Sequence, residues 1–270
     1  MNWFIWIYTE ILYKPLFNAM VFLYNLIPWE GWALAFAIII LTLLIKLALY
    51  TMSSRSIIAQ HEMQELQPKL NDIKEKYKKD KEKQSQEIMK FYKENKINPF
   101  SSCLPLLIQL PILIALYRVF MQGISDPNEL TANLYPFISN PGQLQANFLG
   151  VLDFSTPNII LAILAGVAQF FQSWLMLKMR TKKELEREAE RKRRTKLSGK
   201  APDFADTASN MTKQMAYIMP VITVFISLSL PSGLAFYWII TTVFAIGQQW
   251  LVMKKKEQLE LASEKKSASR

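Results

Sequence analysis

A single lysine inside a long apolar stretch is the first residue of this chain that could do chemistry. Residues 32–52 read WALAFAIIILTLLIKLALYTM, with Lys46 one helical turn after Thr42. About 20 apolar residues cross a bilayer as a helix, and a lysine inside one costs on the order of 2.5 to 3.5 kcal/mol unless it faces protein or water. Lys46 therefore indicates a hydrated cavity. The alternative is that its long side chain reaches up to the lipid headgroups.

Amide side chains occur at similar depths in other apolar stretches. At 1.5 Å per residue, Lys46 lies about 9 Å from the nearer end of its helix, Gln109 about 12 Å, Gln169 about 10 Å and Gln248 roughly 6 to 8 Å. Gln172 follows Gln169 toward the same end. A single glutamine would merely tie two helices together, with a contribution of roughly 0.6 kcal/mol. Several glutamines beside a lysine predict a wet cavity that opens to one side of the membrane.

The composition gives little reason to expect thiol chemistry or metal binding. The chain has one cysteine, Cys103, and one histidine, His61, so it can form neither an internal disulfide nor a histidine cluster. We expect no metal site, no cofactor and no catalytic residue.

The distribution of apolar residues predicts an all-α polytopic membrane protein. Hydrophobic residues make up 51% of the chain and are gathered in five blocks, whereas the charges lie in polar segments between them. The five spans are expected at residues 32–52, 101–123, 156–176, 214–230 and 234–253. The remaining segments are expected to be an interfacial helix (1–31), a cytoplasmic helical hairpin (53–100), an extracytoplasmic loop (124–155), a basic loop (177–213), a turn (231–233) and a basic tail (254–270). Whether a signal peptide or a lipid anchor precedes Met1 stays open.

The predicted hairpin carries two apolar stripes at helical spacing. The first stripe consists of Met63, Leu66, Leu70, Ile73 and Tyr77, and the second of Ile88, Phe91 and Tyr92. The stripes either bind each other or present an outer face to a partner.

The basic residues predict the orientation. All of the 32 Lys and Arg except Lys14, Lys46 and Arg118 lie in the hairpin, the basic loop and the tail. Short loops rich in Lys and Arg stay in the cytoplasm. We therefore expect the amino terminus outside and the carboxyl terminus inside.

Two basic clusters could bind polyanions. They consist of Arg191, Lys192, Arg193 and Arg194 in the loop and of Lys254, Lys255 and Lys256 in the tail. Such clusters suit ribosomal RNA through phosphate contacts, and they equally suit anionic lipid headgroups. Both partners stay open.

Three motifs carry a resemblance to a known family. NPFSSCLPLLIQLPILIALY (98–117), QPKLNDIKEKY in the hairpin, and MPVITVFISLSLPSGLAFYW (219–238) followed by QQWL resemble the YidC, Oxa and Alb family of membrane protein insertases, in its short bacterial form. The resemblance covers residues 32–253. It implies five helices around a hydrophilic groove, with a mobile hairpin and no nucleotide site. Lys46 matches a position where the family usually has Arg, Thr42 matches a family threonine, and Tyr237 and Trp238 match a pair of aromatics.

The resemblance implies insertion of newly made membrane proteins with short acidic amino-terminal tails, without nucleotide hydrolysis. It also implies a monomer in the bacterial cell membrane that works beside the Sec translocon. Two other classes of protein stay open. A solute or ion transporter would use the lysine as a binding or relay site, but no internal repeat is present. In a passive assembly scaffold, Lys46 would have no role.

Overall fold

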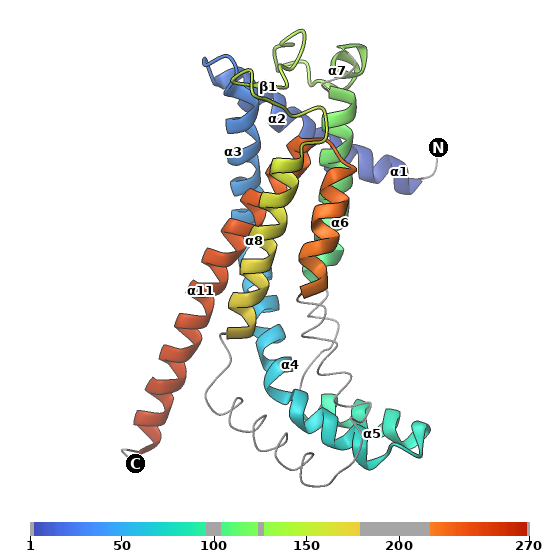
Figure 1. Cartoon of the computed structure of the whole chain (residues 1–270), viewed down its shortest axis with the longest axis vertical. Helices are drawn as coiled ribbons and strands as arrows, with labels where there is room; N and C mark the ends of the chain where they lie inside the picture. Colours follow the sequence, from blue (N-terminus) through green and yellow to red (C-terminus); the bar gives the residue numbers. More distant parts are fainter. Residues whose placement is uncertain (1–2, 96–103, 124–126, 179–216, 269–270) are drawn as a thin grey trace. The chain divides into compact units, whose positions relative to one another are not determined.

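The protein folds almost entirely into α-helices, as Figure 1 shows for the computed structural model. The structure describes residues 3–95, 104–123, 127–178 and 217–268. It consists of two compact units, each of which is described by itself. The first comprises Met1–Tyr50, Leu106–Phe171 and Met219–Ala245, and the second Thr51–Pro105, Gln172–Ile218 and Ile246–Arg270.

The amino-terminal segment of the first unit is helical throughout, with one π-helical stretch. Its elements are α1 (Trp3–Ile7), η1 (Tyr8–Tyr13) and α2 (Lys14–Leu26). Pro15 lies in the first turn of α2, directly after the π-helical stretch. One face of α2 is buried at Phe17, Met20 and Val21, and α2 packs against α3. This face therefore belongs to the protein core.

Each of the five predicted apolar stretches contains helix where the structure describes it. The helices are α3 (Ala33–Ala48), α6 (Leu104–Arg118) with its π-helical extension η3 (Val119–Gly123), α8 (Ile159–Lys178), a helix at Tyr217–Leu228, and α11 (Ser232–Ala268). Among the described residues, Ile159–Met176 and Ser232–Leu259 are long and apolar enough to span a membrane by themselves. A third span results if α3 and Tyr50–Met63 count as one broken span, whereas Leu107–Met121 and Tyr217–Leu228 are shorter apolar helices. The number of five spans stays a prediction.

Two helix boundaries differ from those expected. The first apolar helix stops at Ala48, because Leu49 leaves helical geometry with ψ near 4°, although neither Pro nor Gly marks the break. The last helix does not stop at Met253 but continues to Ala268, so the basic tail is a helical extension of the apolar segment.

The segment expected as a loop (124–155) contains regular structure. It forms α7 (Pro127–Asn133) and a short antiparallel ladder of β1 (Asn147–Phe148) and β2 (Leu152–Asp153), with Phe148 opposite Leu152. Asn18 on α2 fastens this segment: its Nδ2 donates to Asn133 O at 2.8 Å, and its Oδ1 accepts from Tyr135 N at 2.7 Å.

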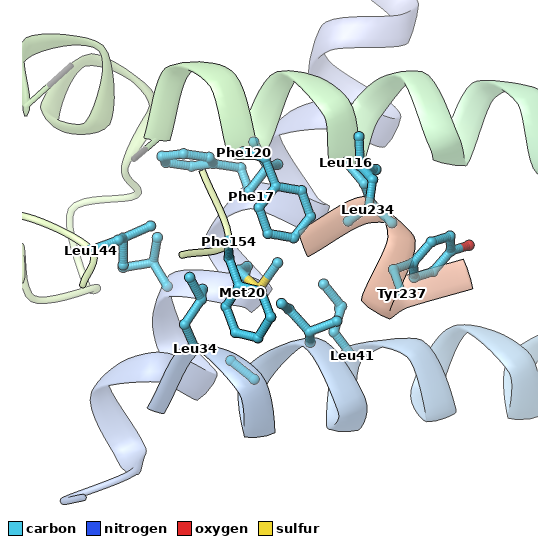
Figure 2. Close-up of a cluster of buried hydrophobic side chains, with 14 of the residues drawn as sticks. Phe17, Met20, Leu34, Leu41, Leu116, Phe120, Leu144, Phe154, Leu234 and Tyr237 are labelled. Carbon is cyan, nitrogen blue, oxygen red and sulfur yellow. The ribbon is translucent and has the colours of Figure 1, made fainter. Parts of the chain in front are cut away.

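One hydrophobic core holds the first unit together. Figure 2 shows how α2, α3, α6 and α11 each contribute side chains to it, together with Leu144 and Phe154 from the segment around the β-ladder. At the edge of this core, the hydroxyl of Tyr237 points away from the apolar cluster. The core therefore fixes the helices that carry the polar side chains described below.

The second unit contains the helical hairpin. Its helices are α4 (Tyr50–Lys76) and α5 (Lys81–Glu94), and α5 turns back beside the end of α4 (Figure 1). Asp80 caps α5 by accepting a hydrogen bond from Lys83 N at 3.0 Å. Gln84 on α5 donates to Lys74 O on α4 at 2.6 Å and so ties the two helices together.

Candidate functional site

Lys46 lies in the last turn of α3, half-buried. No carboxylate or other hydrogen-bonding partner for its Nζ is present among the residues that the structure describes. The last helical turn exposes unpaired carbonyl groups, whose negative partial charge favours a cation there. The early end of α3 thus places the lysine at a helix terminus that favours a cation.

Thr42 lies one turn before Lys46 but is buried. Its Oγ1 donates to Ile38 O at 2.6 Å, which satisfies the hydroxyl within its own helix. Its hydroxyl oxygen keeps acceptor capacity. The structure therefore places Thr42 in the helix packing, beside the exposed part of the lysine.

Gln109 and Tyr237 form a polar contact between two helices of the first unit. Gln109 Nε2 on α6 donates to Tyr237 Oη on α11 at 2.6 Å. Tyr237 is buried, and Gln109 and the neighbouring Trp238 are half-buried. This pairing joins two of the predicted site residues, and it fixes the direction in which the amide of Gln109 points.

The structure adds buried polar residues that the sequence analysis did not single out. They are Thr223 and Ser227 on the helix Tyr217–Leu228 and Thr242 on α11. Ser227 Oγ is buried without a hydrogen-bond partner among the described residues. Thr223 and Ser227 are four residues apart, so helical spacing could have placed both on one face. Among the described residues of the first unit, α3 also buries a polar group, Thr42, and α6 contributes the half-buried Gln109.

The three other glutamines predicted to line the groove do not all belong to the same unit. Gln169 on α8 is half-buried in the first unit, whereas Gln172 and Gln248 belong to the second unit. Gln248 is buried, and both ends of its amide are used: Oε1 accepts from Ser53 Oγ at 3.2 Å, and Nε2 donates to Ser54 Oγ at 3.0 Å. In the structure this amide ties α11 to α4.

The first hairpin stripe faces inward. Leu70 is fully buried, and Met63, Leu66, Ile73 and Tyr77 are half-buried. Burial also raises the pKa of Tyr92 in the second stripe, so this phenol stays neutral at physiological pH.

The basic residues of the tail have unequal surroundings. Lys256 Nζ lies 3.2 Å from His61 Nδ1 and 3.5 Å from Glu65 Oε1, both on α4. Lys254 and Lys255 are exposed, and Lys254 lies over the Trp250 ring at 5.0 Å. The loop cluster of Arg191, Lys192, Arg193 and Arg194 lies outside the described residues. Within the part of the chain that the structure describes, no group of three or more His, Cys, Asp or Glu is placed to hold a metal ion.

Apolar helices long enough to span a bilayer, packed in a unit that buries polar groups, define an all-α polytopic membrane protein. Residues 23–259 match the model of the family described as 60Kd inner membrane protein. The chain belongs to this family.

Relatives in this family share the sequence over most of this chain. A protein of Clostridium tetani is 36% identical over 244 residues, which cover 90% of this chain and 91% of that protein. A protein of Syntrophus aciditrophicus is 34% identical over 256 residues, and one of Campylobacter jejuni 31% over 241 residues. Each of the three is named membrane protein insertase YidC. The chain spans only 37% of each of the latter two proteins, so it is similar to one part of them.

Proposed function

We propose that this protein is a membrane protein insertase that helps newly made membrane proteins to enter and fold in the bilayer, without nucleotide hydrolysis. The observation that carries the proposal is the family match over residues 23–259. This range includes Lys46, which is half-buried and has no hydrogen-bonding partner among the described residues. Relatives of nearly the same length and of greater length bear the insertase name. The polar side chains within the apolar helices suggest how such a protein could work.

The chemical problem is desolvation. A short polar tail that crosses hydrocarbon leaves water behind, and its charges and backbone groups lose their hydrogen bonds. A water-filled groove that reaches partway across the bilayer shortens the dry path. We assign this groove to the first unit, with Lys46, Thr42, Gln109, Gln169, Tyr237 and Trp238 along it. That Gln172 and Gln248 belong to the groove stays a prediction from the sequence.

Lys46 is the residue to which we assign attraction of the substrate. Two opposite charges 4 Å apart attract by about 1 kcal/mol in bulk water and by about 4 kcal/mol at an effective dielectric constant of 20. A half-buried ammonium that has no carboxylate partner in the described part of the chain can make this interaction with an acidic tail. Because Lys replaces the family's usual Arg, the charge is kept and the two-pronged guanidinium contact is lost.

We also propose roles for the segments outside the groove and for partner molecules. The hairpin receives the substrate first, although its stripe from Met63 to Tyr77 is partly buried in the structure. The apolar substrate helix then leaves sideways into lipid. The exposed Lys254 and Lys255 contact the ribosome or anionic lipid, and the Sec translocon is a partner. The protein acts as a monomer in the bacterial cell membrane, with its amino terminus outside.

The test is insertion of one single-span client with a short acidic tail into vesicles that contain Lys46 variants at equal density. Lys46→Arg should keep most of the activity. Lys46→Ala and Lys46→Gln should impair insertion without unfolding the protein, and Lys46→Glu should be worse because it repels the tail. The readout is protection of the tail from external protease.

A matched control removes another lysine of the first unit. Lys14 forms an ion pair with Glu10, so Lys14→Gln should leave tail insertion unchanged. Wild-type activity in Lys46→Ala would refute the role of the charge. Solute flux without tail protection would instead indicate a transporter, and the absence of both activities would favour a scaffold.

A further inference from the structure

The turn between β1 and β2 places an apolar residue in a backbone conformation that suits glycine or asparagine. Leu149 and Gly150 have φ of 53° and 71°, and Val151 N donates to Phe148 O at 3.0 Å. Two central residues with positive φ characterise a type I′ turn, in which Asn-Gly is preferred. The Cβ of a leucine is disfavoured in this conformation. Such an outlier points to a role for the side chain itself.

The side chains of this turn lie on the surface. Leu149 is 51% exposed and Val151 81% exposed. No charged residue occurs between Glu129 and Asp153, so the tip has no charge to hold it in water. Two large apolar side chains at the end of a hairpin favour an apolar environment over water.

The depth of this tip follows from its contacts with the start of α3. Gly31 lies so close that a Cβ built on it would be 3.5 Å from Leu149 N. The Phe148 ring meets the Trp32 ring edge-on, with centroids 4.9 Å apart. Trp32 directly precedes the apolar helix α3. The tip is therefore held level with the point where α3 begins.

The residues beside the tip are typical of a membrane–water interface. Trp29 is 64% exposed and Trp32 is 39% exposed, and tryptophan is enriched at the headgroup level of membrane proteins. Further along α3, Ile40 and Leu43 are also exposed. The apolar surface of the tip thus continues an aromatic belt and the outer face of a membrane helix.

We propose that Leu149, Val151, Trp29 and Trp32 form a lipid-binding surface that inserts into the interfacial region of the leaflet at the amino-terminal end of α3. In the proposed topology this is the outer leaflet. The occupant is lipid because residues 130–152 carry no charged group for a specific partner and the tip is level with the start of α3. The exposed Glu30, between the two tryptophans in the sequence, lies where a carboxylate can stay in the water of the headgroup layer. The surface fixes the depth at which α3 begins, and through the rigid helix it fixes the depth of Lys46. It is distinct from the groove and does not depend on insertase activity.

The test uses the full chain in lipid vesicles of phosphatidylethanolamine and phosphatidylglycerol. Cys103→Ser removes the natural thiol, and Leu149→Cys or Val151→Cys introduces a site for a fluorescent label. Gln143→Cys, at an exposed polar residue of the same segment, is the matched control. Labels at 149 and 151 should be quenched by nitroxide lipids and shielded from aqueous iodide, whereas the label at 143 should show the reverse. Equal quenching by iodide at all three positions would overturn the proposal.

A second variant separates anchoring from folding. Leu149→Asn removes the apolar side chain but suits the left-handed backbone, so the turn should fold and thermal unfolding in detergent should not occur at a lower temperature. A label at 151 should then become more accessible to iodide in vesicles than it is with Leu149. Unchanged shielding would show that Leu149 does not anchor the tip. Shielding that appears in native membranes but not in pure lipid would show that a protein partner covers the surface, which also overturns the proposal.

Discussion

Gly233 lies where the backbone at the start of α11 meets the ring of Phe120. A Cβ at this position would be 2.5 Å from Phe120 Cε1, and Phe120 is itself fully buried, so the ring has little room to move. We expect Gly233→Ala to lower the free energy of unfolding by about 1 to 3 kcal/mol, as overpacking does elsewhere. Unfolding of the protein in detergent micelles by heat or denaturant measures this.

The matched control is another glycine of the same helix. Gly247 has no atom within 4 Å of a Cβ built on it. Gly247→Ala should therefore be neutral or stabilising, by up to about 1 kcal/mol, because alanine favours the helix. If both variants lose the same stability, close packing at Gly233 is not the cause.

The hydrogen bonds of Asn18 can be tested with a substitution that keeps the shape of its side chain. Replacement by leucine, which has a similar outline, leaves Asn133 O and Tyr135 N without their partner. Each unpaired buried group costs about 1 to 3 kcal/mol, so Asn18→Leu should destabilise the protein and increase hydrogen exchange in residues 130–135. Asn25→Leu removes a single exposed hydrogen bond to Ser139 O and should cost less than about 1 kcal/mol. Equal exchange in both variants would contradict the fastening role of Asn18.

At the scale of elements, side-chain contacts hold the last part of α11 against α4. Gln248 contacts Ser53 and Ser54, and Lys256, eight residues later, contacts His61 and Glu65, so the two helices run parallel. Lys256→Gln should increase hydrogen exchange in residues 254–262, because it removes the last of these contacts. Lys255→Gln, at an exposed residue, is the charge-matched control and should leave exchange unchanged. Faster exchange in both variants would attribute the effect to net charge.

The hairpin permits a prediction for a whole element. Its two helices belong to the second unit, whereas the apolar core with Phe17 and Leu234 belongs to the first. Replacement of residues 66–94 by a short Gly-Ser linker should slow client insertion and leave thermal unfolding of the core nearly unchanged. A Gly-Ser insertion between Lys79 and Asp80 keeps both stripes and serves as the control. Client insertion at the normal rate after the deletion would contradict the prediction that substrates enter at the hairpin.

At the scale of the whole molecule, the charge distribution predicts the orientation. The chain carries a net charge of +10, concentrated in segments expected on the cytoplasmic side. In a Cys103→Ser background, Ser139→Cys should react with an impermeant thiol reagent added outside intact cells, and Gln258→Cys should react only after the membrane is permeabilised. Both residues are exposed in the structure, so burial does not confound the comparison. Labelling of Gln258→Cys in intact cells would show that the orientation is the opposite of the predicted one.

Composition and periodicity were enough to predict the all-α membrane fold, and the family was indicated by the resemblance of three sequence motifs. Apolar runs and helical stripes are local signals, because a helix needs only its own residues to show which face is apolar. The sequence also indicated Lys46, because a charge inside an apolar run is visible without any neighbour. The same reasoning found the hairpin stripe that buries Leu70.

Tertiary structure decided which polar groups meet. Gln109 and Gln248 look alike in sequence, as amides inside apolar helices, yet one binds Tyr237 and the other binds two serines of α4. The break at Leu49 and the β-ladder in the expected loop likewise had no clear local signal. The physical reason is that hydrogen-bond partners depend on which helix faces come together. That choice is made by packing between residues far apart in the chain, as with Phe17, Phe154 and Leu234 in one core.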